Sequence, residues 1–218
     1  MSNWDAYSYL GSASFSTRLK NGSIRDPIMR RFAVGRFDMP DIETLRAREK
    51  LVLDHIHDEG TQHWDDVIST FPHPYYELIA TMKVYDGEEG VRGYWAESRG
   101  AFPDQNHELI SLRHSPDAVI VEFWLTGTHL GPLNGIPATG QRFRMRMTAY
   151  FIFDEQENLV SERAYFDTMT MLRQLMGGLN MRNPRNWLWA IRALRGLSKM
   201  TSTPDPRLLD TPPPDLSH

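Results

Sequence analysis

Apolar residues recur at helical spacing in three segments of the first half of the chain. These segments cover residues 41–59, 64–71 and 86–100, and each of them stops at a glycine or a proline. Within each segment the apolar positions follow an i, i+3, i+4 pattern, which is typical of a helix that buries one face. Asp41 precedes the first pattern and has the short acceptor side chain of a helix N-cap. The pattern therefore predicts three helices, with residues 75–85 extended between the second and the third.

The pattern changes after residue 106. Four runs of β-branched and aromatic residues cover residues 108–114, 118–126, 142–153 and 159–167. Segments rich in glycine, proline, aspartate and asparagine separate these runs, which we interpret as a four-stranded antiparallel meander. Because the helices precede the strands instead of alternating with them, the order favours the α+β class.

Three parts are expected along the chain. Residues 1–40 show no sustained period and are interpreted as an N-terminal extension, whereas residues 41–178 form the domain. Residues 179–218 hold a last helix and a proline-rich tail, and we expect the tail to be disordered or extended over the surface. The apolar side of the last helix consists of Trp187, Leu188, Ile191 and Leu194. We expect this side to pack on the domain or on a neighbouring subunit rather than on a membrane.

Composition excludes several kinds of chemistry. The 218 residues include no cysteine, which rules out disulfides, thiolate metal sites, cysteine nucleophiles and iron–sulfur clusters. With 24 Lys and Arg against 28 Asp and Glu, the net charge of −4 argues against a nucleic-acid partner. The sequence shows no glycine-rich phosphate loop, secretory signal or membrane span, so we expect a cytoplasmic protein with no membrane partner.

Two motifs resemble those of a known family. The segment 126–140, TGTHLGPLNGIPATG, is similar to the strand-connecting loop of the SnoaL-like polyketide cyclases and ester cyclases. The second motif, ERAYFD at 162–167 followed by MLRQL at 171–175, resembles the last strand and the closing turn of that family. The resemblance covers roughly residues 41–178 and points to the nuclear transport factor 2-like superfamily.

This resemblance implies an α+β fold in which three N-terminal helices pack in the concave face of a strongly curved antiparallel sheet. A cone-like α+β barrel of this kind encloses one apolar pocket for a small molecule. The superfamily includes ring-closing cyclases, epoxide hydrolases, steroid isomerases and cofactor-free lyases of lignin-derived diaryl compounds. Its members are commonly homo-oligomers, and the fold alone does not settle the reaction.

The sequence departs from the family at its catalytic positions. The acidic residue of the last strand is replaced by Ala164, and the inward histidine of the preceding strand is replaced by Ala149. Because residues two apart on a strand share a face, Glu162 points inward together with Ala164. The residues expected to line a pocket for an apolar or aromatic substrate are Tyr75, Tyr76, Tyr94, Phe123, Met145, Met147, Ala149 and Ala164. The three tyrosines either donate hydrogen bonds to a substrate oxygen or only pack.

Three residues are candidates for acid–base catalysis. Burial among apolar side chains would raise the pKa of the Glu162 carboxyl group toward neutrality. Glu77 lies where the chain enters the first strand, the place of the general base in the steroid isomerases, and is otherwise a salt-bridged rim residue. His129 belongs to the Gly-Thr-His turn, where it either stabilises the turn or lies at the cavity mouth.

Histidines and aspartates gather in the segment 54–58, but their spacing does not favour a metal site. His55 and His57 would lie about 200° apart around a helix, whereas zinc-binding helices use pairs of ligands at i and i+4. We therefore interpret the segment as a solvated helix face and predict no metal and no cofactor.

The predicted outer face of the sheet indicates a subunit contact. Glu122 and Trp124 share that face, on which Glu122 is expected to pair with Arg144 or Arg146. An exposed tryptophan beside paired charges is typical of an interface, so we expect a homo-oligomer.

These observations lead to one main functional hypothesis. The protein is expected to be a cofactor-independent enzyme with acid–base lyase, cyclase or isomerase chemistry. Its substrate would be an apolar, aromatic metabolite such as a lignin-derived diaryl compound or a polyketide. The alternative is a non-catalytic ligand-binding or assembly protein of the same fold.

Overall fold

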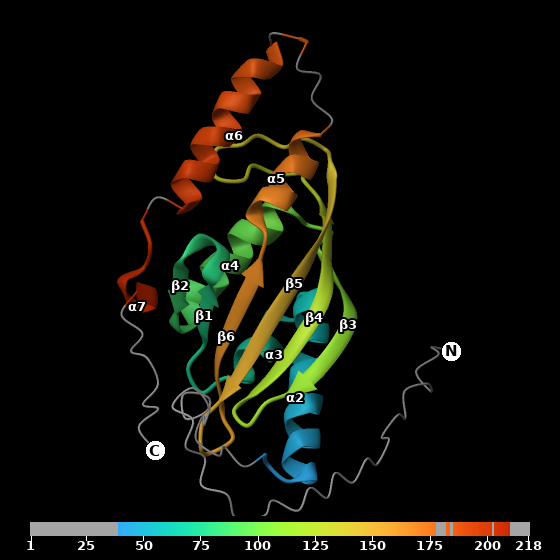
Figure 1. Cartoon of the computed structure of the whole chain (residues 1–218), viewed down its shortest axis with the longest axis vertical. Helices are drawn as coiled ribbons and strands as arrows, with labels where there is room; N and C mark the ends of the chain where they lie inside the picture. The colour runs from blue at the N-terminus through green and yellow to red at the C-terminus, as the bar shows by residue number, and fades with distance from the viewer. Residues whose placement is uncertain (1–38, 178–181, 184, 202, 210–218) are drawn as a thin grey trace, which may run out of the picture. The chain divides into compact units, whose positions relative to one another are not determined.

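The computed structural model describes residues 39–177, 182–183, 185–201 and 203–209 (Figure 1). The N-terminal extension, apart from residues 39–40, and the end of the tail lie outside the described residues. The division into an extension, a domain at 41–178 and a C-terminal part therefore stays a prediction.

The three predicted helices are confirmed. They are α2 (Ile42–Thr61), α3 (Trp64–Ser69) and α4 (Gly87–Ala101). Asp41 is the N-cap of α2, and its side chain accepts a hydrogen bond from the Thr44 amide at 2.8 Å. The helix continues past Gly60, because its left-handed C-cap, Gln62 (φ 64°), donates its amide to the last turn.

One six-stranded sheet contains the four predicted strands. The strands are β1 (Tyr75–Leu78), β2 (Lys83–Asp86), β3 (Asn106–His114), β4 (Ala118–Thr128), β5 (Arg142–Phe153) and β6 (Leu159–Phe166). Their order is β2-β1-β6-β5-β4-β3, so the antiparallel meander from β3 to β6 is confirmed. The extended segment 75–85 forms β1 and β2, joined by the 3-10 turn Ile79–Thr81, and β1 pairs in parallel with β6.

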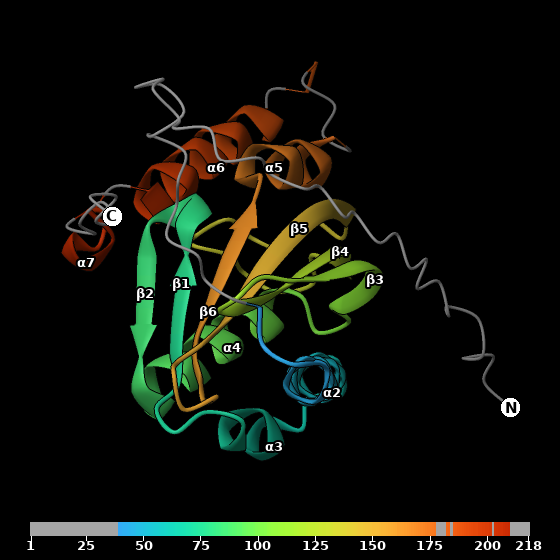
Figure 2. The same ribbon diagram turned by 60° about the horizontal axis from the view of Figure 1, so that its bottom comes forward.

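The helices cover one face of this sheet. Figure 2 shows α2, α3 and α4 on the same side of the curled strands. Side chains alternate along β5, where Met145 and Met147 are buried and Arg144 and Arg146 are exposed. The buried set packs with apolar residues of all three helices in one core, so the α+β fold implied by the resemblance is confirmed. We call the helix-covered face of the sheet its inner face.

Charges and one tryptophan mark the outer face. The guanidinium group of Arg144 lies 3.9 Å from the centre of the Trp124 ring, and that of Arg146 lies 5.0 Å from it. Arg146 also forms the predicted ion pair with Glu122, whereas Arg144 pairs with Glu108 at 2.8 Å. The homo-oligomer that this face was expected to form stays a prediction.

In the described part of the chain, three helices follow the sheet. They are α5 (Thr168–Met176), α6 (Arg185–Thr201) and α7 (Pro206–Leu209). Gln174 of α5 holds the end of β5, because its amide bonds the backbone of Arg144 in both directions, at 2.7 and 2.9 Å. On α6, Gly196 packs closely against Ile136. Among the described residues, none of the helices combines the length and the apolar character needed to cross a lipid bilayer.

Two expectations about the C-terminal part need correction. The apolar side of α6 was expected to pack on the domain, but it is exposed in the single chain. Its exposed fractions are 59% for Trp187, 53% for Leu188, 47% for Ile191 and 65% for Leu194. Packing on a neighbouring subunit is not tested. The described part of the tail is not simply extended, because α7 forms and Arg207 holds it to β2 by an ion pair with Asp86 at 2.7 Å.

Candidate functional site

An apolar pocket lies on the inner face of the sheet. Leu125, Phe143, Met145, Met147 and Phe166 line it from the strands, while Tyr94 and Phe102 line it from the α4 side. Polar groups stand among these residues at a few points. They are Thr81, Lys83, Tyr85, Glu97, Ser98, Gln105 and Asn134. A mostly apolar cavity with few polar groups is the usual form of a small-molecule site.

The predicted pocket residues divide into three sets. Tyr94, Met145 and Met147 line the pocket. Four others are buried in the core without lining the cavity, and these are Tyr76, Phe123, Ala149 and Ala164. Tyr75 was expected to line the pocket but does not. It is the register partner of Asp86 on β2, and its ring centre lies 5.8 Å from the guanidinium group of Arg207, away from the inner face.

Glu77 does not point into the pocket. In β1, Tyr76 and Leu78 face the core and Glu77 faces the other way, as strand alternation requires. Its carboxylate forms an ion pair with Arg163, its register partner on β6. Glu77 is therefore the salt-bridged residue that we expected from the sequence as the alternative to a general base. We assign Glu77 no role in the chemistry proposed below.

His129 stabilises a turn. It is fully buried, and its Nδ1 lies 3.1 Å from Thr139 Oγ1 and accepts the Thr139 amide at 3.3 Å. Its ring packs on Phe102 at 5.4 Å, and burial lowers its pKa. His129 is not among the residues that line the pocket, so the structure places it in the turn and not at the cavity mouth.

A buried polar cluster that the sequence patterns did not reveal lies deeper in the core. It contains His55 and Glu59 of α2, one helical turn apart, and Glu162 of β6, and we call these three residues the buried triad. The Nε2 atom of His55 lies 3.3 Å from Glu162 Oε2 and 3.0 Å from the Tyr76 hydroxyl. His55 is 0% exposed, so the interpretation of this helix segment as a solvated face was wrong for His55. The i, i+4 spacing of His55 and Glu59 was the signal that could have revealed the pair.

Hydrogen bonds set the tautomer of His55. The hydroxyl of Thr70 donates to the Val67 carbonyl at 2.7 Å and therefore accepts from His55 Nδ1–H at 2.9 Å. In the neutral ring Nε2 then carries the lone pair, which faces Tyr76 and Glu162. The Tyr76 hydroxyl can donate a hydrogen bond to this nitrogen, and Glu162 Oε2 lies beside it. The imidazole, the phenol and the carboxyl group thus meet at one buried nitrogen.

Glu59, the second carboxyl group of the triad, has a raised pKa. Burial, and then the negative charge of Glu162, raise the pKa of Glu59 to about 7. His55 and Arg99 oppose this shift. The Glu59 carboxyl group therefore holds its proton up to about neutral pH, the range in which acid–base catalysis in cells takes place.

This raised pKa predicts a pH-dependent stability. The unfolded Glu59 carboxyl ionises near 4.5 and the folded one near 7, so the free energy of unfolding falls as the pH rises through this window. We expect Glu59→Gln to remove up to about 3 kcal/mol of this decrease. Urea unfolding of both proteins between pH 4 and 8 measures the difference, with Glu43→Gln on the exposed face of α2 as control. If the difference in the free energy of unfolding between the two proteins does not change with pH over this range, the raised pKa of Glu59 is refuted.

Tyr94 connects the pocket with the triad. It lines the pocket, and its ring centre lies 6.1 Å from that of Tyr76. Burial, with the nearby charges of Glu59 and Glu162, raises the pKa of Tyr94 well above its ordinary value, so its phenol stays protonated. Its hydroxyl remains a donor at neutral pH, which is the state that stabilises a negatively charged oxygen.

Small side chains separate the pocket from Glu162 along the sheet. Ala149 and Ala164 are register partners on the inner face, between Met147 with Phe166 at the pocket end and Phe151 with Glu162 at the other. Both alanines are fully buried and present only a methyl group. The strip of sheet between the cavity and the carboxylate therefore carries no bulky side chain of its own.

The buried triad also has the composition of a cation site. One ligand atom from each residue lies within 4.8 Å of the others, and imidazole with carboxylates suits several divalent metals. The Tyr76 hydroxyl, however, already occupies the side of His55 Nε2, and the guanidinium charge of Arg99 acts on Glu59. We therefore interpret the triad as a buried polar cluster and not as a metal site. A second group, Asp58, His63 and Asp66, is largely exposed.

Comparison with known proteins supports the fold. The family model of the SnoaL-like polyketide cyclases matches residues 51–175. AclR from Streptomyces galilaeus is 20% identical, with a TM-score of 0.52 over 62% of this chain and 98% of its own. A SnoaL-like protein from Jannaschia sp. CCS1 is 19% identical, with a TM-score of 0.55 over 65% of this chain and 97% of its own. IdmH from Streptomyces antibioticus is 22% identical, with a TM-score of 0.51 over 59% of this chain and 97% of its own. A comparison with curated protein sequences finds no match.

Proposed function

Because the chain belongs to the SnoaL-like polyketide cyclase family, we propose that it is a small-molecule enzyme that uses acid–base chemistry without a cofactor. The reaction would be of lyase, cyclase or isomerase type, in which a C–C or C–O bond is made or broken next to a proton transfer. The observation that carries this proposal is the buried contact between His55 Nε2 and Glu162 Oε2 at 3.3 Å, with the Tyr76 hydroxyl on the same nitrogen. A buried imidazole and a carboxyl group in contact are suited to take a proton from a substrate and return it.

The pocket supports an apolar substrate. Its walls are built of methionine, phenylalanine and leucine side chains, which favour an aromatic ring system over a sugar or a nucleotide. In this proposal the Tyr94 phenol donates a hydrogen bond to a substrate oxygen on which negative charge develops. The reacting carbon would extend past Met147, over Ala149 and Ala164, toward Glu162. A lignin-derived diaryl compound or a polyketide has the required ring character.

A second candidate function is ligand binding without turnover. Two observations favour it: the acidic family residue is replaced by Ala164, and the buried triad is not among the residues that line the pocket. In that case the cavity would hold an aromatic molecule unchanged.

One experiment separates the two functions. The purified protein is incubated with a panel of aryl diols and linear polyketides, and native mass spectrometry identifies what is bound and what is released. Catalysis predicts a product with an altered mass, or an isomer resolved by chromatography, that accumulates beyond one equivalent of protein. Recovery of only unchanged ligand, at no more than one equivalent, would contradict the proposed enzyme and support the binding protein.

A further inference from the structure

Lys83 is the basic residue among those that line the apolar pocket. It is the first residue of β2, and its register partner is Leu78 of β1, a buried residue that also lines the pocket. Residues directly opposite each other in an antiparallel pair share a face, so Lys83 lies on the inner face of the sheet. Lys83 itself lines the pocket. β2 is also the edge strand of the sheet, where a lysine hinders pairing with another chain.

The ammonium group of Lys83 has no ion-pair partner among the residues that the structure describes. No carboxylate oxygen of those residues lies within 4.0 Å of its nitrogen, although Glu97 lines the same pocket. Three arginines of the outer face, Arg144, Arg146 and Arg163, by contrast, each have a carboxylate partner. An unpaired cation beside apolar walls is a binding group for an anion.

Neighbouring side chains fit the same ligand. Tyr85 lies two residues further along β2 on the same face, and burial, with the charge of Glu97, raises its pKa to about 12. Its phenol therefore stays a hydrogen-bond donor at neutral pH. Asn134 lines the pocket as well and offers an amide donor. One cation and two neutral donors match one negative charge, whereas a dianion would leave a charge unpaired near Glu97.

We propose that Lys83 binds the carboxylate of an otherwise apolar, aromatic ligand. The carboxylate would pair with Lys83 and the donors of Tyr85 and Asn134, while the ring system fills the part of the pocket formed by Met145, Met147 and Phe143. This inference names the substrate class of the proposed enzyme and in that sense rests on the proposed function. It applies equally to a ligand that is bound and not converted.

The C-terminal part of the chain holds the segment that carries Lys83. We call residues Thr203–Leu209 the strap. The amide of Asp205 donates to the carbonyl of Met82 at 2.8 Å, and residues 203–206 line a small hollow together with Met82, Lys83 and Val84. Met82 itself has a left-handed backbone (φ 53°), which is unfavourable for a residue other than glycine. The hydrogen bond from the Asp205 amide helps to hold the turn before Lys83 in this conformation.

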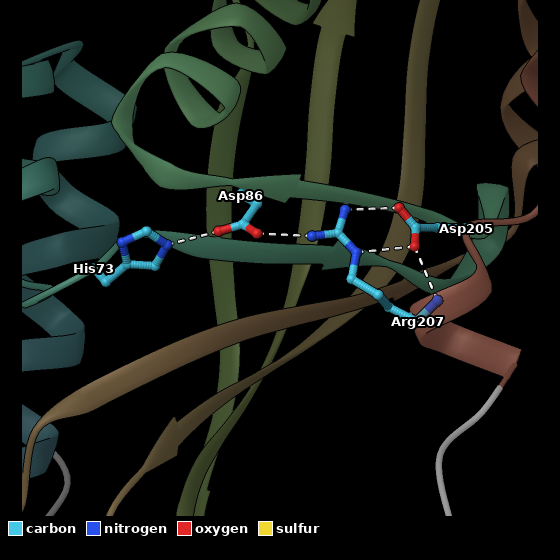
Figure 3. Close-up of polar contacts among 4 residues, drawn as sticks. All are labelled: His73, Asp86, Asp205 and Arg207. Atoms are coloured by element: carbon cyan, nitrogen blue, oxygen red, sulfur yellow. Dashed lines mark hydrogen bonds and ion pairs between the residues drawn. The ribbon is translucent and has the colours of Figure 1, made fainter.

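Arg207 fastens the strap at the other end of β2. Figure 3 shows its guanidinium group between two carboxylates, with Asp86 Oδ2 at 2.7 Å and Asp205 Oδ2 at 2.8 Å. His73 Nε2 lies 2.6 Å from the second oxygen of Asp86 and completes the network. The strap thus binds β2 at both ends, at Met82 and at Asp86, and fixes the backbone of the strand that bears Lys83. Arg207 is a positioning residue in this proposal.

A matched pair of ligands tests the proposal. Biphenyl-4-carboxylate and its neutral carboxamide are titrated against the full chain by calorimetry at pH 7, and the ratio of the two dissociation constants is compared between variants. Lys83→Met keeps the length and apolar stem of the side chain and should reduce the preference for the carboxylate about tenfold or more. The exposed Lys50, paired with Asp54, provides the control variant Lys50→Met, which should leave the ratio unchanged.

Each outcome of these titrations either supports or overturns carboxylate binding by Lys83. An unchanged ratio in a folded Lys83→Met protein, or no preference in the native protein, overturns the proposal. A biphenyl phosphonate that binds more tightly than the carboxylate overturns the assignment to a monoanion. Arg207→Ala should lower the same ratio by a factor of about 3 without weakening carboxamide binding, whereas loss of both affinities would mean only a structural role. Glu162→Gln should retain the ratio, so a failure of the proposed catalysis is distinguishable from a failure of this inference.

Discussion

Replacing Glu162 with glutamine is expected to lower kcat/KM by about 10³-fold on any substrate that the protein turns over. The carboxamide has nearly the shape of the carboxyl group but can neither take nor release a proton at neutral pH. Because Glu162 is 94% buried beside His55 Nε2, no solvent molecule can easily replace it. His55→Gln should have an effect of similar size, since it removes the other half of the pair. Steady-state kinetics with the most reactive compound of the panel measure both.

Glu77→Gln is the matched control for this experiment. It makes the same chemical change on the neighbouring strand, but on the outer face, where the carboxylate pairs with Arg163. Its kcat/KM should stay within about threefold of the native value, even though loss of the ion pair lowers stability. If Glu77→Gln abolished turnover and Glu162→Gln did not, the site would have to be sought on the other face. Thermal unfolding of all three variants verifies that they are folded.

Gly131→Ala is expected to destabilise the protein by about 3 kcal/mol. Gly131 lies in the loop between β4 and β5, where its amide and that of Leu130 both donate to the Ala101 carbonyl at the end of α4, at 3.1 and 3.0 Å. A methyl group there would lie far inside van der Waals contact with the Gly100 carbonyl oxygen and 2.9 Å from the carbon of that carbonyl. Since backbone atoms cannot rotate away as a side chain does, the loop must move. Chemical unfolding measures the loss.

The same substitution within α4 should act in the opposite direction. A methyl group at Gly93 meets nothing within 4 Å, and Gly93 lies in the exposed interior of the helix. Gly93→Ala should therefore stabilise the protein by roughly 0.5–1 kcal/mol, because alanine loses less backbone entropy on folding. Equal stability changes at both glycines would show that the loop does not pack on α4 as described. The loop also supplies Leu133 and Asn134 to the pocket, so Gly131→Ala should weaken ligand binding as well.

The sequence patterns were sufficient wherever a local rule decided the structure. Asp41 caps α2 because its side chain reaches the amide of Thr44 within the same turn. Met145 and Met147 face the pocket because a strand has a period of two, and the same period places Glu162 and Ala164 on one face. None of these positions depends on residues far away in the chain.

The period of two did not by itself assign Glu77 to the correct face. A short strand such as β1 has too few residues for its alternation to show which face is inner, and Glu77 is as buried as its neighbours. Its orientation follows from the parallel register with β6, in which Glu77 pairs with Arg163 and Tyr76 with Glu162. That register joins residues more than 80 positions apart and cannot be read from either segment.

The amino-acid sequence by itself determined the family, the α+β order of the elements and the inward position of Glu162. Each of these is written in local patterns and motifs. Only the tertiary structure decided that His55 is part of the buried triad. A histidine between polar neighbours reads as solvent-exposed, and its burial results from the packing of α2 on the sheet, which brings Nε2 to Glu162 and Nδ1 to Thr70. The same holds for Lys83, because only the folded sheet places this lysine in the lining of an apolar pocket.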